Sequence, residues 1–420
     1  MTMHPLLTRA MLKRAIVLFC VLSAAPAVGA DPAAAGPIGP VRWNLEALAL
    51  PPHFSDAPIS EPGVRGIFYD GLPLAGKPTR VFAWLGLPNH AAGEKVPAMV
   101  LVHGGGGTAH AHWVRLWNER GYAAIAMDTC GAGMAANEPN QKRLDDGGPS
   151  CSDAGVDPRF RRVDLPIEDQ WTYHAVADIV LANSLLRSLG EVAAEQIGLT
   201  GISWGGYLTC ITAGVDQRFK FAAPVYGCGF LGESPYWTPT FEQLGPGIVE
   251  KWLALWDPSI YLPQAKMPML WVSGDLDAAF PLGALQKSYR LPPGERYLAI
   301  RHAMPHGHGP PGESPPEILA LARQINAHGV PLARMTEQGI DGRRAWAQFA
   351  AQAPLVRSQL ISTKDSGPWR KREWKLADAE LDKTTARVTA TLPEGTRAFY
   401  FALFDQRECV ASSEHVECDP

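Results

Sequence analysis

A chain of 420 residues exceeds the roughly 100–200 residues of a typical domain, so the sequence predicts one large domain and a smaller one. Apolar residues make up 46% and charged residues 19% of the chain, a composition that excludes a disordered or charge-driven polymer. The formal net charge is −4 and no long block of Lys and Arg occurs. Phosphate binding needs such a block, so we expect no nucleic-acid partner.

The start of the chain has the organisation of a secretory signal peptide. Arg9, Lys13 and Arg14 precede an apolar run at residues 15–22, and small residues follow it. The run is shorter than the roughly 20 residues that span a bilayer, so we expect cleavage and export to the periplasm or medium, without stable membrane insertion. Removing residues 1–30 deletes three basic residues and no acidic one, which changes the net charge from −4 to −7.

Six cysteines follow this segment, an even number that permits disulfides in an oxidising compartment. The first pair that we expect is Cys409 with Cys418, because only a short polar segment separates them. Cys130 with Cys151 would close a glycine-rich loop. No C-x-x-C pair occurs, which argues against a structural zinc site.

Strand-like and helix-like segments then alternate along most of the chain. We expect strands at residues 64–69, 79–87, 96–102, 122–127, 196–200, 219–226, 267–273 and 296–300. We expect helices at residues 110–120, 170–189 and 316–327. Alternation of this kind predicts an α/β fold with a mainly parallel sheet covered by helices.

After Pro331 the pattern changes to short alternating segments separated by turns rich in Gly and Pro. The expected strands are residues 355–363, 372–376, 386–392 and 398–405. The sequence therefore predicts a signal peptide at residues 1–30, an α/β domain at residues 31–333 and a small β-sandwich-like domain at residues 334–420.

Residues 201–205, Gly-Ile-Ser-Trp-Gly, form a G-x-S-x-G motif between a predicted strand and a helical stretch. The motif alone occurs by chance, but at this position it is a specific signal for a nucleophilic serine. Ser203 must sit on a sharp turn with strained dihedral angles, and Gly201 and Gly205 allow neighbouring backbone to pass close by. The helix that begins after Ser203 offers N–H groups to a developing oxyanion.

A serine hydroxyl needs a base, and the base needs an orienting carboxylate. In this architecture the chain order is serine, acid, histidine. Asp277, in the loop after a late strand, is the expected acid, with Asp275 as the alternate. The loop after the final strand carries three histidines. We expect His308 to be the base, with His306 as the next candidate and His302 as the last.

Residues 103–107, His-Gly-Gly-Gly-Gly, follow a predicted buried strand and supply the other half of an oxyanion hole. We expect the N–H groups of Trp204 and Gly105 to hold the oxyanion. A phosphate-binding loop is disfavoured because no G-x-x-x-x-G-K-[ST] pattern occurs here. Further candidates for the substrate pocket are Gly104, Gly106, Trp171 and Tyr173, of which the two aromatic residues are explained equally well by core packing.

These motifs resemble those of the α/β-hydrolase superfamily. Within it they are similar to the secreted acetylxylan-esterase and dienelactone-hydrolase-like branch, which is related to prolyl-oligopeptidase-type hydrolases. The resemblance rests on HGGGG at 103–107, GISWGGY at 201–207, GDLD at 274–277 and PHGHG at 305–309. It covers about residues 64–330. It implies an eight-stranded sheet, a triad of Ser203, His308 and Asp277, and no cofactor or metal.

The resemblance implies a serine carboxylic-ester hydrolase that acts through an acyl-enzyme on a small-molecule or carbohydrate ester. The alternative is a serine peptidase acting on short peptides, which the lack of a large β-propeller disfavours. A metal hydrolase built on the H-x-H pairs at 110–112 and 306–308 is a weaker reading, because residues i and i+2 of a helix point apart. A non-enzymatic carbohydrate-binding protein is disfavoured because the triad and both oxyanion elements are present.

Overall fold

The computed structural model describes residues 40–418 apart from residues 106, 135–140, 152–156 and 327–328. The expected signal peptide at residues 1–30 lies outside the described residues. By their contacts, residues 37–420 form one compact unit. None of the described helices combines the length and the apolar character that a bilayer crossing requires.

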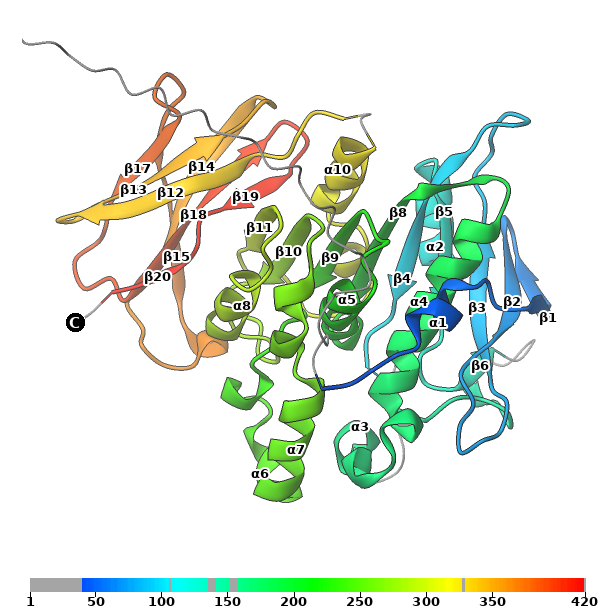
Figure 1. Cartoon of the computed structure of the whole chain (residues 1–420). Coiled ribbons are helices and arrows are strands. Elements are labelled where there is room, and N and C mark those ends of the chain that lie inside the picture. Colours follow the sequence, from blue (N-terminus) through cyan, green and yellow to red (C-terminus); the bar gives the residue numbers. More distant parts are fainter. Residues whose placement is uncertain (1–39, 106, 135–140, 152–156, 327–328, 419–420) are drawn as a thin grey trace, which may run out of the picture. The chain divides into compact units, whose positions relative to one another are not determined.

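The main sheet has nine strands in the order β1-β2-β3-β5-β4-β8-β9-β10-β11 (Figure 1). Strands β5, β4, β8, β9, β10 and β11 pair in parallel, and β1, β2 and β3 form an antiparallel edge. The strands are β1 (Phe54–Glu61), β2 (Val64–Asp70), β3 (Arg80–Gly86), β4 (Val96–Val102), β5 (Ala123–Met127), β8 (Val192–Ile202), β9 (Phe221–Val225), β10 (Met269–Gly274) and β11 (Arg296–Arg301).

The predicted fold class is confirmed, with one strand more than the eight expected. The missed strand is β1, an edge strand in which only Ala57 is buried. Its polar residues give no apolar alternation that a sequence pattern can detect. In contrast, every residue of β5 is buried and only Pro97 of β4 is partly exposed. Strands buried on both faces read as continuous apolar runs, which is why the centre of the sheet was predictable.

The order of the strands places the helices and the site. Helix α2 (Ala111–Glu119) connects β4 to β5, and α4 (Trp171–Ser188) connects β5 to β8 on the other side of β4. Because both crossovers are right-handed, this reversal puts α2 and α4 on opposite faces of the sheet (Figure 1). Helix α5 (Trp204–Val215) packs beside α4. The loops after β4 and β8 therefore meet where the strand order reverses, the usual place for a ligand site in such sheets.

The C-terminal strands form two antiparallel sheets, β12-β13-β17-β16 and β15-β14-β18-β19, with β20 also paired to β18 (Figure 1). They are β12 (Arg334–Asp341), β13 (Arg344–Ala350), β14 (Leu355–Thr363), β15 (Trp374–Asp378), β16 (Glu380–Asp382), β17 (Arg387–Thr391), β18 (Ala398–Asp405), β19 (Val410–Ser412) and β20 (Val416–Glu417). Leu360, Val388 and Phe401 belong to an apolar core of their own. Sequence patterns located β14 and β18 with their observed bounds but missed β12 and β13.

Among the described cysteines, Cys130 and Cys151 form one disulfide. The expected pairing of Cys409 with Cys418 is wrong, because the two residues lie at opposite ends of β18. Asp405, at the end of that strand, donates its N–H to Cys409 O, whereas Cys418 donates its N–H to Arg397 O, just before the strand begins. A strand of eight residues spans roughly 25 Å, far beyond the reach of a disulfide.

Candidate active site

Ser203 sits on a tight turn between β8 and α5. Its φ of 57° and ψ of −116° lie outside the regions that a residue with a side chain prefers, and such strain is typical of functional turns. The turn is possible because Gly205 follows. A Cβ at that position would lie 2.1 Å from the carbonyl oxygen of Val102. The serine hydroxyl is thereby held at the carboxyl end of the sheet and the amino end of α5.

Ser203 Oγ lies 2.9 Å from His306 Nε2, and His306 Nδ1 lies 2.6 Å from Asp277 Oδ2. Asp277 is only 4% exposed, and its other oxygen accepts the N–H of Phe280 at 2.8 Å. The His306 ring lies between the rings of Tyr226 and Phe280, with centroid separations of 4.7 and 6.3 Å. The three side chains therefore form a continuous serine–histidine–aspartate chain with the imidazole fixed by packing.

The structure corrects the choice of histidine. His306, the alternate, contacts Ser203, while the preferred His308 is turned toward other partners. His308 Nδ1 lies 3.0 Å from Glu313 Oε1, and its Nε2 accepts the N–H of Gly104 at 3.0 Å. Both histidines lie in one short loop, so spacing along the chain did not distinguish them. The aromatic residues that clamp His306 come from remote segments.

Asp275, the alternate acid, and His302, the third candidate base, form a separate pair. Asp275 is fully buried, and its Oδ2 lies 2.7 Å from His302 Nδ1. The same oxygen accepts the hydroxyl of Tyr400 from β18 at 3.0 Å, and Oδ1 accepts the N–H of Ala303 at 2.8 Å. Asp275 thus anchors the loop that carries His306 to the C-terminal sheet.

The expected oxyanion segment lies against Ser203. A Cβ on Gly104 would be 3.3 Å from the Ser203 Cβ. Gly105 packs against the indole of Trp204, where an added Cβ would be 2.3 Å from Cδ1. Trp204 is the first residue of α5, so its N–H belongs to the unsatisfied first turn of a helix. The fourth pocket candidate of this group, Gly106, lies outside the described residues.

The two aromatic pocket candidates are packing residues. Trp171 is 3% exposed, and its indole N–H donates to Thr129 O at 2.7 Å while its ring meets Trp204 edge-on. Tyr173 stacks on Trp43 at 5.3 Å. Both side chains pack against other aromatic rings, as the core-packing interpretation expects.

Sequence reasoning missed Arg159, whose guanidinium lies 4.3 Å above the ring centroid of Trp204. Its Nη1 is buried without a hydrogen-bond partner among the described residues. Its other nitrogens hold Asp157. No motif surrounds this arginine in the sequence, and only the fold brings it against Gly105 and Trp204.

His110 and His112 also lie closer together than expected. His110 does not belong to the helix but precedes α2 with extended backbone angles, φ −109° and ψ 110°. The rule that helical residues i and i+2 point apart therefore does not apply, and the two rings are 5.1 Å apart. Burial, followed by repulsion from His308 and His112, lowers the pKa of His110 to about 4. Burial opposes ionisation of Glu313, but hydrogen bonds and charge from His308 and His112 outweigh it and lower its pKa to about 2.

His103 holds the oxyanion segment to the neighbouring strand. It is 2% exposed, its Nδ1 donates to Gly104 O at 2.7 Å, and its Nε2 accepts the N–H of Thr129 at 3.0 Å. Protonating Nε2 would break the second bond inside the core. Burial accordingly lowers the pKa of His103 to about 3, although the bond to Gly104 acts in the opposite direction. Unfolding therefore takes up a proton below about pH 6.5.

We expect the free energy of unfolding to fall as the pH drops from 6.5 toward 4, with His103 contributing about 1.4 kcal/mol per pH unit. The His103→Gln variant keeps an acceptor for Thr129 N–H but does not titrate, so its stability should fall less steeply. Asp128, whose pKa burial raises to about 6, acts in the opposite direction and is present in both proteins. Urea unfolding at several pH values measures both slopes, and equal slopes would contradict this role of His103.

A pocket of about 370 Å³ opens beside the triad. Asp277 is one of its lining residues, and the C-terminal region supplies part of its wall. Its aromatic residues are Tyr236, which is 50% exposed, and Trp369, which stacks on Trp374 at 6.2 Å. The remaining lining residues are Pro235, Ala278, Pro281, Pro368, Arg370 and Lys371.

The acetyl xylan esterase (AXE1) family matches residues 47–234. This segment contains Ser203 and the glycine-rich loop but ends before Asp277 and His306. Among solved structures, an acetyl xylan esterase from Paenibacillus sp. R4 is 22% identical with a TM-score of 0.51, covering 68% of this chain and 92% of its own. Acetyl xylan esterase 1 from Thermoanaerobacterium sp. JW/SL YS485 is 16% identical with a TM-score of 0.50 and the same coverage of both chains.

A comparison with the curated proteins finds no match. The two solved structures share the fold of this chain, and the sequence match lies over the strands and loops that hold the serine. The nine-stranded sheet, the strained serine turn after β8 and the family match lead to the same assignment. The chain has the α/β-hydrolase fold and is similar, over residues 47–234, to the acetyl xylan esterases.

Proposed function

We propose that the protein is a serine carboxylic-ester hydrolase that acts through an acyl-enzyme on carbohydrate esters. The observation that carries the proposal is the hydrogen-bonded chain from Ser203 Oγ through His306 to Asp277. The resemblance to acetyl xylan esterases over residues 47–234 supports an ester as the substrate.

In the first half of the reaction, Ser203 Oγ attacks the ester carbonyl while His306 Nε2 takes the hydroxyl proton. Asp277 accepts the Nδ1–H and stabilises the imidazolium that forms. The Trp204 N–H at the start of α5, with a backbone N–H of the glycine segment, holds the oxyanion. His306 then returns the proton to the departing alcohol, which leaves the acyl group on Ser203.

In the second half, water attacks the acyl-enzyme and His306 again serves as the base. The proton taken from water passes to Ser203 Oγ as the acid is released. His306 is suited to both transfers, because its side chain is 32% exposed and water reaches it, whereas Asp277 is buried behind it. His306 is thus protonated and deprotonated twice in each turnover, and the triad returns to its starting state.

The pocket beside Asp277 supports a carbohydrate alcohol group. Tyr236 and Trp369 present aromatic surface, against which the C–H faces of sugar rings pack, and Lys371 offers a hydrogen-bond donor. A volume of about 370 Å³ is within the range of sites that hold small organic ligands. Of the triad, Asp277 lines this pocket, which supports a sugar bound beside the triad.

A substrate panel tests this proposal. We expect acetate release from acetylated sugars and no cleavage of a peptide anilide. A small aryl acetate should be cleaved more slowly than its high chemical reactivity alone would predict. The Trp369→Ala variant should raise KM for acetylated sugars about tenfold, the loss of roughly 1.4 kcal/mol of contact, and leave the aryl acetate unaffected. Faster cleavage of the peptide anilide would favour a peptidase and overturn the assignment.

We also propose that the protein is exported. The disulfide between Cys130 and Cys151 supports this, because disulfides persist in oxidising compartments and are rare in the cytosol. The charged and apolar pattern of residues 1–30 supports the same location.

A further inference from the structure

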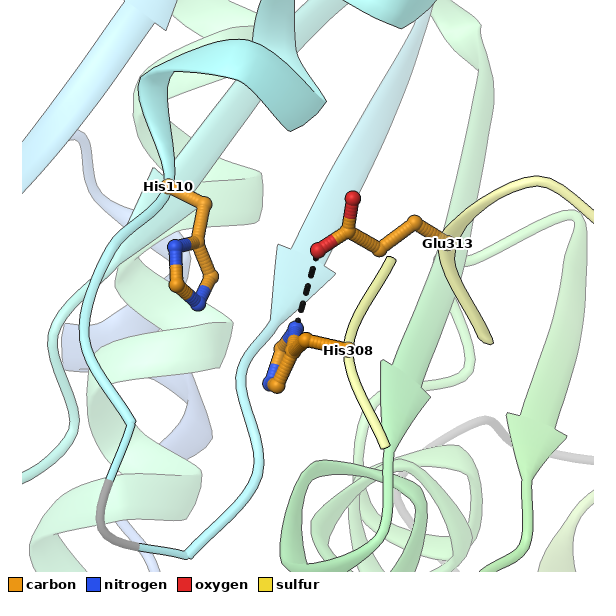
Figure 2. Close-up of side chains that lie close together, drawn as sticks. All are labelled: His110, His308 and Glu313. Carbon is orange, nitrogen blue, oxygen red and sulfur yellow. Dashed lines mark hydrogen bonds and ion pairs between the residues drawn. The ribbon is translucent and has the colours of Figure 1, made fainter. Parts of the chain in front are cut away.

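A second cluster of histidines and a carboxylate lies beside Ser203 and takes no part in the proposed acyl transfer. Glu313 lies 3.0 Å from His308 Nδ1 through one oxygen and 2.7 Å from His112 Nε2 through the other. The ring of His110 is 4.5 Å from that of His308. Figure 2 shows His110 and His308 approaching each other from two separate loops, with Glu313 bonded to His308.

The possible ligand atoms of this cluster lie close to one another. One ligand atom from each of His110, His308 and Glu313 lies within 4.8 Å of the others. Two imidazole nitrogens and one carboxylate oxygen are a zinc-type donor set that leaves a fourth position open. Donor atoms around tetrahedral zinc are about 3.3 Å apart, so small side-chain rotations bring these three into range.

One nitrogen of the cluster is buried without a partner among the described residues. Glu313 is 4% exposed, and His110 Nε2 is buried with no hydrogen-bond partner among the described residues. A buried polar atom without a partner is rare and destabilising. The backbone around Glu313 is fixed, because Trp113 Nε1 donates to Glu313 O at 3.0 Å. This arrangement holds the side chains near the geometry that a cation needs.

We propose that His110, His308 and Glu313 bind one divalent transition-metal ion of the zinc type. His112 holds Glu313 in place through its second oxygen. The site is distinct from the triad, because the described hydrogen bonds of these side chains go to Gly104 and to one another and not to Ser203 Oγ or Asp277. It does not depend on the proposed esterase activity.

The hydrogen bonds show how the ion would be coupled to the glycine segment. Gly104 N–H donates to His308 Nε2, so a neutral ring carries its single proton on Nδ1, facing Glu313. A cation at Nδ1 moves that proton to Nε2, and Gly104 N–H then loses its acceptor. Metal binding therefore changes the partner of a backbone group that lies next to Ser203.

Metal content tests the proposal. The protein is stripped with a chelator, incubated with Zn²⁺, separated from excess metal by gel filtration and subjected to elemental analysis. We expect about one zinc per chain in the parent protein and in Ser203→Ala, and at least a tenfold loss of bound zinc in Glu313→Gln and His110→Ala. His90→Ala removes a histidine far from the cluster in sequence and serves as the matched control that keeps its zinc.

Further measurements distinguish loss of the metal site from loss of the fold. Circular dichroism establishes that each variant is folded. Co²⁺ in place of Zn²⁺ should give the visible absorption of a four-coordinate site in the parent protein, Ser203→Ala and His90→Ala, but not in Glu313→Gln or His110→Ala. Zn²⁺ should also raise Tm in the parent protein and in His90→Ala, but not in Glu313→Gln. No retained zinc in the parent protein, or equal zinc in folded Glu313→Gln and His110→Ala, would overturn the proposal.

Discussion

Replacing Ser203 by alanine is expected to lower kcat for ester cleavage by about 10⁶-fold, because the nucleophile and its base act as one unit. The variant removes the oxygen that lies 2.9 Å from His306 Nε2 and leaves the turn intact. Alanine meets the same backbone constraint as serine at a φ of 57°, so stability should change little. Initial rates with an aryl acetate and thermal unfolding measure the two effects separately.

A serine-directed phosphonate provides the control for this variant. It should form one adduct, on Ser203 of the parent protein, and none with Ser203→Ala, as read by mass spectrometry of the intact chain and its peptides. Substantial esterase activity in the folded variant, or labelling at another serine, would show that a different nucleophile is used.

The comparison of His306→Ala with His308→Ala should separate two residues that are only two positions apart. His306 contacts both Ser203 and Asp277, so its loss should cost about 10⁶-fold in kcat, as for the nucleophile. His308 contacts Gly104 N–H, and its loss should cost no more than the 10²–10³-fold or so that removing an oxyanion donor costs. Steady-state kinetics on one ester at one pH measures the difference.

A matched pair sharpens this comparison. His308→Gln keeps a polar side chain of similar reach, and it should remain active, whereas His306→Gln should be as impaired as His306→Ala because an amide is not a base. Equal losses at both positions, or a larger loss at His308, would mean that the observed hydrogen bonds do not describe the reacting arrangement.

The elements that the sequence predicted well are those whose surroundings impose a simple pattern. The apolar runs of β4 and β18 predicted the observed bounds, because nearly every residue of both strands is buried. The bounds of β14 were also predicted. Ser203 was identifiable because the turn needs glycine on each side. Strands β1 and β12 were not, because most of their side chains face solvent and polar alternation resembles a loop.

The histidine at the serine was not predictable, because its selection depends on groups far away in the chain. Tyr226 follows β9, Phe280 follows β10, and together they clamp His306 rather than His308. The cluster at Glu313 was hidden for a similar reason. A short helix, α9 (Pro310–Glu313), returns this carboxylate to the loops after β4, about 200 residues earlier in the chain. Contacts between segments so far apart in the chain produce no periodic pattern in the sequence.

The bond from Tyr400 to Asp275 makes the two halves of the chain hard to separate. Cutting away the C-terminal strands would leave a carboxylate stranded in apolar surroundings, with one fewer donor to hold it. The loop bearing His306, which is bonded to Asp275 through Ala303, would lose its link to the C-terminal sheet at the same time. Shortened or chimaeric versions of this protein must therefore supply another hydroxyl that reaches Asp275, because the C-terminal strands help to hold the loop that carries His306.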